Sequence, residues 1–176
     1  SPTRDSKLPF GYIEACVQGY WSQIMIVVTG GAGFIGSAIA QELNMRGRMD
    51  LLIVDDINHP EKEKNITSIK YQELRGINSF LGEIIERDIN SIEAIIHMGA
   101  CSSTTETDEK FLIKNNYHYT RHLATYALEK GIRFIYASSA ATYGSGEMGY
   151  SDDESKLNKL KPLNLYGESK HKFDIW

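Results

Sequence analysis

Ile24-Met-Ile-Val-Val-Thr-Gly-Gly-Ala-Gly-Phe-Ile-Gly36 is the stretch that decides the fold of this chain. Its first half is a short apolar, β-branched run, which predicts a buried strand. The glycines that follow allow a tight turn: Gly30 opens it, Gly33 lets a pyrophosphate approach the backbone, and Gly36 lets the next helix pack close to the strand. The stretch therefore predicts a strand, a glycine-rich turn and a helix that together bind a dinucleotide.

The segments after this turn complete the same unit. A helix is expected from about Phe34 to about Arg46, with Ile35, Ile39 and Leu43 on one face, and its first N–H groups would hold a diphosphate. A second apolar run, Leu51-Leu-Ile-Val54, ends in Asp55-Asp56. Asp55 follows Gly36 by about 20 residues, the spacing at which an acid reads a ribose hydroxyl.

Strands and helices continue to alternate through the rest of the chain. Helices are expected at Ile77–Glu86 and from about Asp108 to Lys130, and strands at Ala94–His97 and Ile132–Ala137. This alternation predicts an α/β fold, a Rossmann-like doubly wound parallel sheet. In such sheets the carboxyl ends of the strands share one edge, where ligands bind. The glycines, Asp55, Gly99-Ala-Cys101 and Ser138-Ser139 all follow predicted strands, so they would meet at that edge.

Tyr166-Gly-Glu-Ser-Lys170 carries two groups that suit proton transfer. Positions i and i+4 of a helix share one face. A tyrosine titrates near pH ~10, and a lysine cation beside it favours the phenolate and lowers that pKa. With a serine hydroxyl to hold a substrate oxygen, these groups would take a proton from an alcohol, while a bound dinucleotide takes the hydride.

The composition argues against several other classes of protein. The 176 residues carry a formal net charge of −4, which gives no electrostatic reason to expect nucleic acid or an anionic membrane as partner. No apolar stretch reaches the ~18 residues of a membrane span, and the two cysteines, Cys16 and Cys101, make no disulfide framework. We expect a cytoplasmic protein. Residues 1–23 show no periodicity and are interpreted as a leader or unassigned segment, and residues 24–176 as an incomplete, C-terminally truncated dinucleotide-binding domain without its substrate domain.

Three motifs resemble the extended short-chain dehydrogenase/reductase family: Thr29-Gly-Gly-Ala-Gly-Phe-Ile-Gly36, the turn at Ser139, and Tyr166-x-x-x-Lys170. Over about residues 24–176, further segments resemble the branch of that family that epimerises ADP-heptoses at C6. Those segments are Gly99-Ala-Cys-Ser-Ser-Thr-Thr-Glu106, Asn115-Asn-Tyr117, Ala137-Ser-Ser-Ala-Ala-Thr-Tyr-Gly144 and Pro162-Leu-Asn-x-Tyr-Gly-x-Ser-Lys170.

This resemblance implies transient oxidation at C6 of a nucleotide-activated heptose by tightly held NADP, for the inner core of lipopolysaccharide. Tyr166 would move the proton, helped by Lys170, and Ser139 would be the catalytic serine; the full-length protein would be a homo-oligomer. The residues that the resemblance places around the cofactor are Gly30, Gly33, Phe34, Ile35, Gly36, Asp55, Asp56, Lys62, Met98, Gly99, Ala100, Cys101, Ser102, Asn115 and Lys170.

Two positions affect which cofactor is expected, and one of them differs from the family pattern. Met98 stands where the family commonly has an acid, so a contact there would use backbone only. Asp55 by itself predicts NAD, because a carboxylate repels a 2′-phosphate. Lys62 nearby would offset that charge, and we expect NADP, with NAD as the alternative.

Other functions stay open at this point. A sugar-nucleotide dehydratase needs an acid–base pair after the serine, where this chain has Ala140-Ala141. A C4 epimerase of UDP-hexoses and a non-catalytic dinucleotide-binding module fit the same motifs. His118 and His122 have the spacing of a metal pair but lack a third ligand, so no metal site is expected. We expect the 176-residue chain on its own to be poorly stable and inactive in epimerisation, which turnover of ADP-heptose would contradict.

Overall fold

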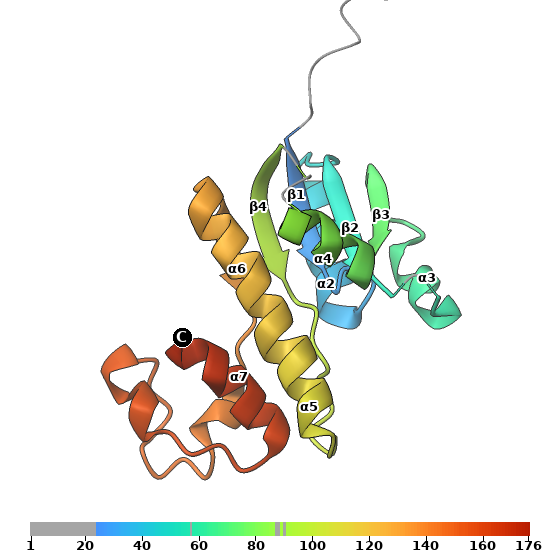
Figure 1. The fold of residues 1–176 in the computed structure, drawn as a ribbon. Helices are drawn as coiled ribbons and strands as arrows, with labels where there is room; N and C mark the ends of the chain where they lie inside the picture. The colour runs from blue at the N-terminus through green and yellow to red at the C-terminus, as the bar shows by residue number, and fades with distance from the viewer. Residues whose placement is uncertain (1–23, 57, 87–88, 90) are drawn as a thin grey trace, which may run out of the picture.

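A five-stranded, all-parallel sheet is the centre of the computed structural model, which describes residues 24–56, 58–86, 89 and 91–176 (Figure 1). The strand order is β3-β2-β1-β4-β5. The strands are β1 Met25–Thr29, β2 Leu51–Asp55, β3 Glu73–Gly76, β4 Ile92–His97 and β5 Arg133–Tyr136. The predicted doubly wound parallel sheet is confirmed. The segment 1–23, interpreted above as a leader, lies outside the described residues.

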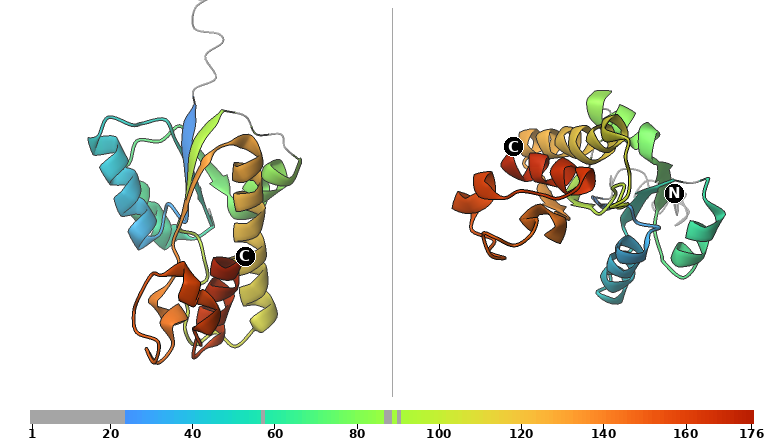
Figure 2. Two further views of the ribbon diagram at one scale, coloured as in Figure 1. Left: turned by 90° about the vertical axis from the view of Figure 1, so that its left-hand side faces the viewer. Right: turned by 90° about the horizontal axis from the view of Figure 1, so that it is seen from below.

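Helices cover both faces of the sheet (Figure 2). Met25 and Val27 of β1 pack in the core under α4 (Ile77–Glu86) and α6 (Tyr119–Lys130). Ile26 and Val28 point the other way, into the core under α2 (Phe34–Met45) and α3 (Pro60–Ile66). Side chains alternate along a strand, so a strand between two helical layers must be apolar at every position. All five residues of β1 are buried, as the continuous apolar run predicts.

The strand β3 and the helix α3 are elements that the sequence pattern did not predict. β3 is the edge strand Glu-Leu-Arg-Gly, and none of its residues is fully buried. A half-exposed edge strand needs no run of apolar residues, so the periodicity signal is absent there. α3 is seven residues long and begins with a proline.

Of the apolar residues expected on one face of α2, Leu43 packs against the core and Ile39 is half-buried, whereas Ile35 is exposed. Ile35 is 62% exposed, and the buried residues of the helix are Gly36 and Ala40. A Cβ atom on Gly36 would lie 2.1 Å from the Gly30 carbonyl oxygen. The helix therefore approaches the glycine turn too closely for a large side chain, and its face is turned toward the small residues.

The long helix after the cysteine is interrupted rather than uniform. Asp108 caps α5 (Glu109–Leu112) by accepting a hydrogen bond from the Phe111 N–H. The backbone then forms a π-helical segment, η1 (Ile113–His118), before it continues as α6. Such segments are frequent at functional sites. Gly131 ends α6 with a left-handed backbone, φ +66°, a conformation that glycine adopts readily.

The last helix, α7 (Leu165–Ile175), lies beside η1 and two short 3₁₀ turns, η2 (Ala140–Tyr143) and η3 (Glu154–Lys159). Asn164 caps it through the Gly167 N–H at 2.7 Å. Phe173 packs against Tyr117 and Ala124 in a third apolar cluster. These contacts place α7 on the same side of the sheet as α4 and α6 (Figure 2). No helix in the described part of the chain is long and apolar enough to cross a membrane.

Candidate dinucleotide and catalytic site

The glycine turn (Gly30–Gly33) and the cysteine turn (Gly99–Ser102) touch at the carboxyl ends of β1 and β4. Gly30 has φ +66°, and a Cβ atom on it would lie 2.7 Å from the Gly99 nitrogen. The Gly30 N–H donates to the Val54 carbonyl at 2.7 Å, which fixes the turn against β2. The two turns are therefore packed too closely to admit a side chain at Gly30, where the left-handed backbone also favours glycine.

The N-terminus of α2 points out of this turn with its backbone donors uncapped. Gly33, the N-cap residue, supplies no side-chain bond, and the first turn of the helix carries no acid. Phe34, the first residue of the helix, is 90% exposed. Uncapped N–H groups and the positive end of the helix dipole suit a diphosphate. The residues present thus fit the phosphates of a dinucleotide.

Asp55 ends β2 with a carboxylate that is 2% exposed and fully engaged. One oxygen, Oδ2, accepts from the Ala32 N–H at 2.9 Å. The other, Oδ1, accepts from the Asp56 N–H at 2.7 Å and from the Lys62 ammonium at 2.6 Å. The ion pair with Lys62 offsets the negative charge beside the glycine turn, while Asp56 itself is exposed.

A chain of buried hydrogen bonds runs beneath the two turns. Gly99 N–H donates to Thr29 Oγ1 at 3.2 Å, and Thr29 Oγ1 lies 2.5 Å from His97 Nδ1. On the other ring nitrogen, Nε2 lies 2.9 Å from Thr120 Oγ1, which donates to the Asn116 carbonyl. Since the Thr120 proton is used there, Nε2 donates and Nδ1 accepts from Thr29. Burial, with a smaller contribution from Lys170, lowers the pKa of His97 to about 3. His97 is therefore a neutral link between the turns and the π-helical segment.

Asn116, in that π-helical segment, connects the cysteine turn to α7. Its side chain is fully buried. Oδ1 accepts from the Cys101 N–H at 2.9 Å, and Nδ2 donates to the Cys101 carbonyl at 2.9 Å and to Ser169 Oγ at 3.0 Å. Sequence reasoning selected the neighbouring Asn115, whose amide donates to Phe111 O. The register of the π turn decides which of the two asparagines points inward, and no periodicity argument shows it.

Lys170, in the middle of α7, is buried and only 3% exposed. Its Nζ lies 5.9 Å from the centre of the Tyr136 ring. Burial lowers the pKa of Lys170, and the Asp174 carboxylate acts in the opposite direction. Tyr166, half-buried, stands one helical turn earlier on the same face.

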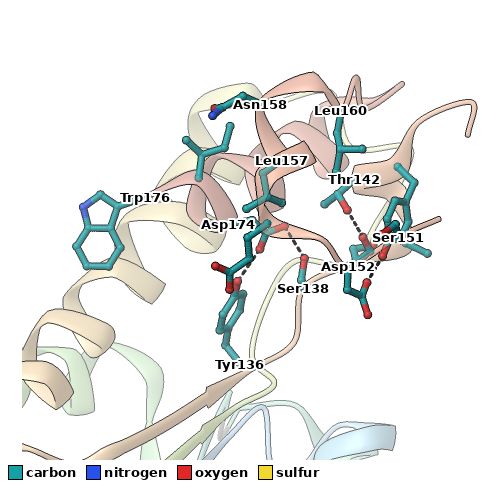
Figure 3. Close-up of a pocket in the computed structure, with 15 residues that line it drawn as sticks. Tyr136, Ser138, Thr142, Ser151, Asp152, Leu157, Asn158, Leu160, Asp174 and Trp176 are labelled. Carbon is teal, nitrogen blue, oxygen red and sulfur yellow. Dashed lines mark hydrogen bonds between the residues drawn. The ribbon is translucent and has the colours of Figure 1, made fainter. Parts of the chain in front are cut away.

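The helix that carries Tyr166 lies against the serine turn (Ala137–Ser139) and the 3₁₀ turn η2 that follows it. A Cβ atom on Gly167 would lie 2.9 Å from the Ala141 carbonyl, so glycine at this position permits the contact. Ser139 Oγ accepts from the Ala141 N–H at 3.2 Å. Ser138 has a different role, because its hydroxyl donates to Asp174 at 2.6 Å (Figure 3).

A cavity of about 770 Å³ opens beside this turn, lined by Ser138, Ser139, Asp174 and residues of η2 and η3 (Figure 3). The glycine turn does not line it, so the cavity lies on the serine side of the edge. In the described residues 24–56, 58–86, 89 and 91–176, no cluster of three acidic, histidine or cysteine side chains is placed to hold a metal ion. His118 and His122 are both exposed.

Taken with the parallel sheet, the glycine turn, the uncapped helix and the engaged aspartate define a dinucleotide-binding protein. The model of the NAD-dependent epimerase/dehydratase family matches residues 26–176. The chain belongs to this family, whose cofactor is a nicotinamide dinucleotide.

Comparison with individual proteins shows which members of the family this chain is similar to. ADP-L-glycero-D-manno-heptose-6-epimerase of Nitratidesulfovibrio vulgaris is 48% identical over 153 residues, 86% of this chain and 47% of that protein. The crystal structure of the enzyme of that name from Helicobacter pylori matches with a TM-score of 0.73 and 28% identity, over 87% of this chain and 49% of that one. UDP-glucuronic acid 4-epimerase from Bacillus cereus, solved in complex with NAD, matches with a TM-score of 0.66 and 26% identity, over 86% of this chain and 50% of that one. The chain spans about half the length of the curated relatives it matches.

Proposed function

We propose that this protein is an epimerase that interconverts ADP-D-glycero-D-manno-heptose and ADP-L-glycero-D-manno-heptose at C6 with bound NADP, for the inner core of lipopolysaccharide. The observation that carries the proposal is the packing of α7 on the serine turn, which brings Tyr166 and Lys170 to the edge that also holds the glycine turn. The 48% identity to a heptose epimerase supports the choice of substrate.

In this proposal the residues of the serine turn and of α7 share the proton chemistry. Ser139 holds the oxygen on C6 by a hydrogen bond, and Tyr166 takes the proton of that hydroxyl as the carbon is oxidised. Lys170, as a cation, stabilises the phenolate of Tyr166. The nicotinamide, when bound, supplies a reversible hydride acceptor. The ketone formed at C6 is then reduced on its opposite face by the same hydride, and its oxygen takes up a proton again, so that the configuration of C6 is inverted.

The glycine turn and α2 would hold the diphosphate, and Asp55, Asp56 and Lys62 the adenosine ribose. A free carboxylate favours the 2′-hydroxyl of NAD. Because the Asp55 carboxylate already accepts three hydrogen bonds, one of them from Lys62, the usual repulsion of a 2′-phosphate is offset. This pairing supports NADP over NAD.

The choice of cofactor is tested by the dissociation constants of the chain for NADP⁺ and NAD⁺. We expect tighter NADP⁺ binding, and a loss of about tenfold for NADP⁺ alone in Lys62→Ala, the effect of one charge-assisted bond of about 1.4 kcal/mol. Lys64→Ala, an exposed lysine in the same helix, is the matched control and should change neither constant. Tighter binding of NAD⁺ by the unaltered chain would refute the choice of NADP.

The substrate is tested in the protein encoded by the complete reading frame that contains residues 24–176. Epimerisation of ADP-heptose, followed by NMR of the C6 proton, should occur with added NADP⁺ and be abolished by Tyr166→Phe. Turnover of UDP-glucose in place of ADP-heptose would select the C4-epimerase alternative. Cofactor binding without turnover of either sugar would select the non-catalytic module.

A further inference from the structure

Asp174 lies one helical turn after Lys170, where α7 passes β5 and the serine turn (Figure 3). Its two carboxylate oxygens accept from different partners: Oδ1 from the Tyr136 hydroxyl at 2.7 Å, and Oδ2 from the Ser138 hydroxyl at 2.6 Å. Tyr136 is the last residue of β5, and Ser138 directly precedes Ser139. One side chain therefore joins α7 to both ends of the segment that leads into the catalytic serine.

We propose that Asp174 is a positioning residue of the reaction, which holds the serine turn against the helix of Tyr166 and supplies the negative charge that faces the Lys170 ammonium. This inference rests on the roles of Ser139, Tyr166 and Lys170 proposed above. Asp174 itself touches neither substrate nor cofactor in this proposal.

The geometric part of the inference follows from where the serine turn is attached. Ser139 Oγ bonds to Ala141, within its own turn, and so contributes nothing to the attachment. Among the contacts that join this region to α7 are the close approach of Gly167 to Ala141 and the bond from Ser138 to Asp174. They lie about two helical turns apart on α7. The Ala137 N–H donates to the His97 carbonyl at 3.1 Å and holds the start of the turn. Losing the bond from Ser138 to Asp174 therefore lets the Ser138–Ser139 end shift relative to α7, and a displacement of about 1 Å at a reacting group costs on the order of a hundredfold in rate.

The electrostatic part follows from the groups around Lys170. Asp174 stands on the same helix, the Tyr136 ring lies 5.9 Å from the ammonium, and Lys170 contributes to lowering the pKa of His97 on β4. His97 is neutral, because burial lowers its pKa to about 3. Tyr136 is also neutral, because burial, the bond to Asp174 and the charges of Asp174 and Glu154 raise its pKa. Asp174 is thus the anion that opposes the effect of burial on the pKa of Lys170.

The charge effect can be measured without activity, by NMR titration of the Lys170 side chain in the 176-residue chain. In Asp174→Asn, which keeps the size and one acceptor, we expect the Lys170 titration to move to lower pH, because the opposing charge is gone. Asp153→Asn removes an exposed aspartate at the start of η3 and should leave the titration in place. An unchanged Lys170 titration in Asp174→Asn would overturn the charge role.

The positioning effect is read from amide hydrogen exchange at Ser139. Exchange should be faster in Ser138→Ala, which removes only the bond to Asp174, and faster still in Asp174→Ala. If Asp174→Ala does not fold, Ser138→Ala carries the comparison alone. Equal protection of the Ser139 amide in Ser138→Ala and in the unaltered chain would overturn the positioning role.

Turnover in the protein of the complete reading frame links both effects to the reaction. The step needs Lys170 as a cation, so activity is lost as pH rises through the Lys170 pKa, and Asp174→Asn should move this alkaline limb to lower pH. An equal loss at every pH would show a merely structural role and contradict the inference. Absence of turnover in the unaltered protein would refute the proposed function instead, while the shift of the Lys170 titration would stand.

Discussion

The glycine turn after β1 and the serine turn after β5 lie at the same edge of the sheet, yet different contacts hold them. The glycine turn is fixed by its own backbone: Gly30 donates to Val54, and Gly33 donates back to Gly30 at 3.0 Å. The serine turn has one backbone bond of this kind, from the Ala137 N–H to the His97 carbonyl at 3.1 Å. It is also attached by a side chain distant in sequence, Asp174, and by a helix that packs against it. The glycine turn, where we place the cofactor, works only if side chains are absent. The serine turn, where we place the proton chemistry, works only if particular side chains are present.

The largest effect is expected where a side chain is added to the backbone-built region. Gly36→Ala would place a Cβ atom 2.1 Å from the Gly30 carbonyl oxygen and 2.7 Å from its carbon. Neither atom can move without opening the turn, so we expect a loss of about 3 kcal/mol or more in the free energy of unfolding, together with loss of dinucleotide binding. Urea denaturation measures the loss of stability, and NADP⁺ titration measures the loss of binding.

Gly82→Ala is the control for that change. Gly82 lies inside α4, and a Cβ atom there meets nothing within 4 Å. Because alanine is the better helix former, the substitution should stabilise the chain by about 0.5–1 kcal/mol. Similar losses in both variants would mean that the closeness of α2 to the glycine turn does not determine stability.

The second largest effect is expected at Asn116, which attaches the cysteine turn by side-chain bonds. Asn116→Ala leaves the Cys101 N–H, the Cys101 carbonyl and Ser169 Oγ without that partner. Each unsatisfied buried group costs about 1–3 kcal/mol, so we expect a total loss of about 2–3 kcal/mol, since α7 and the turn can partly relax. Thermal and urea unfolding measure it.

Asn115→Ala provides the comparison on the same π turn. Its amide bonds only to an exposed helical carbonyl among the described contacts, so stability should change by less than about 0.5 kcal/mol. The family resemblance places Asn115 at the cofactor, and we expect weaker NADP⁺ binding instead. A stability loss in Asn115→Ala equal to that in Asn116→Ala would contradict the assignment of the inward-facing residue.

The contrast between the two regions also explains which features could be predicted from the sequence alone. The strand–glycine–helix unit, Asp55 and the parallel sheet are visible as local patterns, because the backbone geometry demands glycine and β-branched residues at fixed spacing. The edge strand β3, the inward turn of Asn116 and the pairing of Asp174 with Tyr136 and Ser138 depend on contacts between distant segments. The exposure of Ile35 in α2 has the same kind of cause, since the closeness of the glycine turn leaves room only for Gly36 and Ala40 at the buried positions.

The smallest effect on stability is expected at His97, which connects the glycine turn to the π-helical segment through Thr29 and Thr120. The folded state holds His97 neutral, with a pKa lowered to about 3 from the ordinary value of 6.5. Between these values the unfolded chain binds one proton more, so stability is full above pH 6.5 and is lost as pH falls below it. One unit below, at pH 5.5, the loss from this group is about 1.4 kcal/mol.

Urea denaturation across this range, in the unaltered chain and in His97→Gln, isolates that loss. Glutamine keeps a donor and an acceptor but does not titrate, so the variant should be less stable at pH 7.5 and lose less stability than the unaltered chain on acidification. His122→Gln, an exposed histidine of α6, should leave the acid dependence as it is. If His97→Gln showed the same acid dependence as the unaltered chain, His97 would be charged in the fold, and Thr29 could not then donate to its Nδ1. Both ring nitrogens would then be donors. The Thr29 hydroxyl would accept from the Gly99 N–H and from His97 together, and its own proton would need another acceptor.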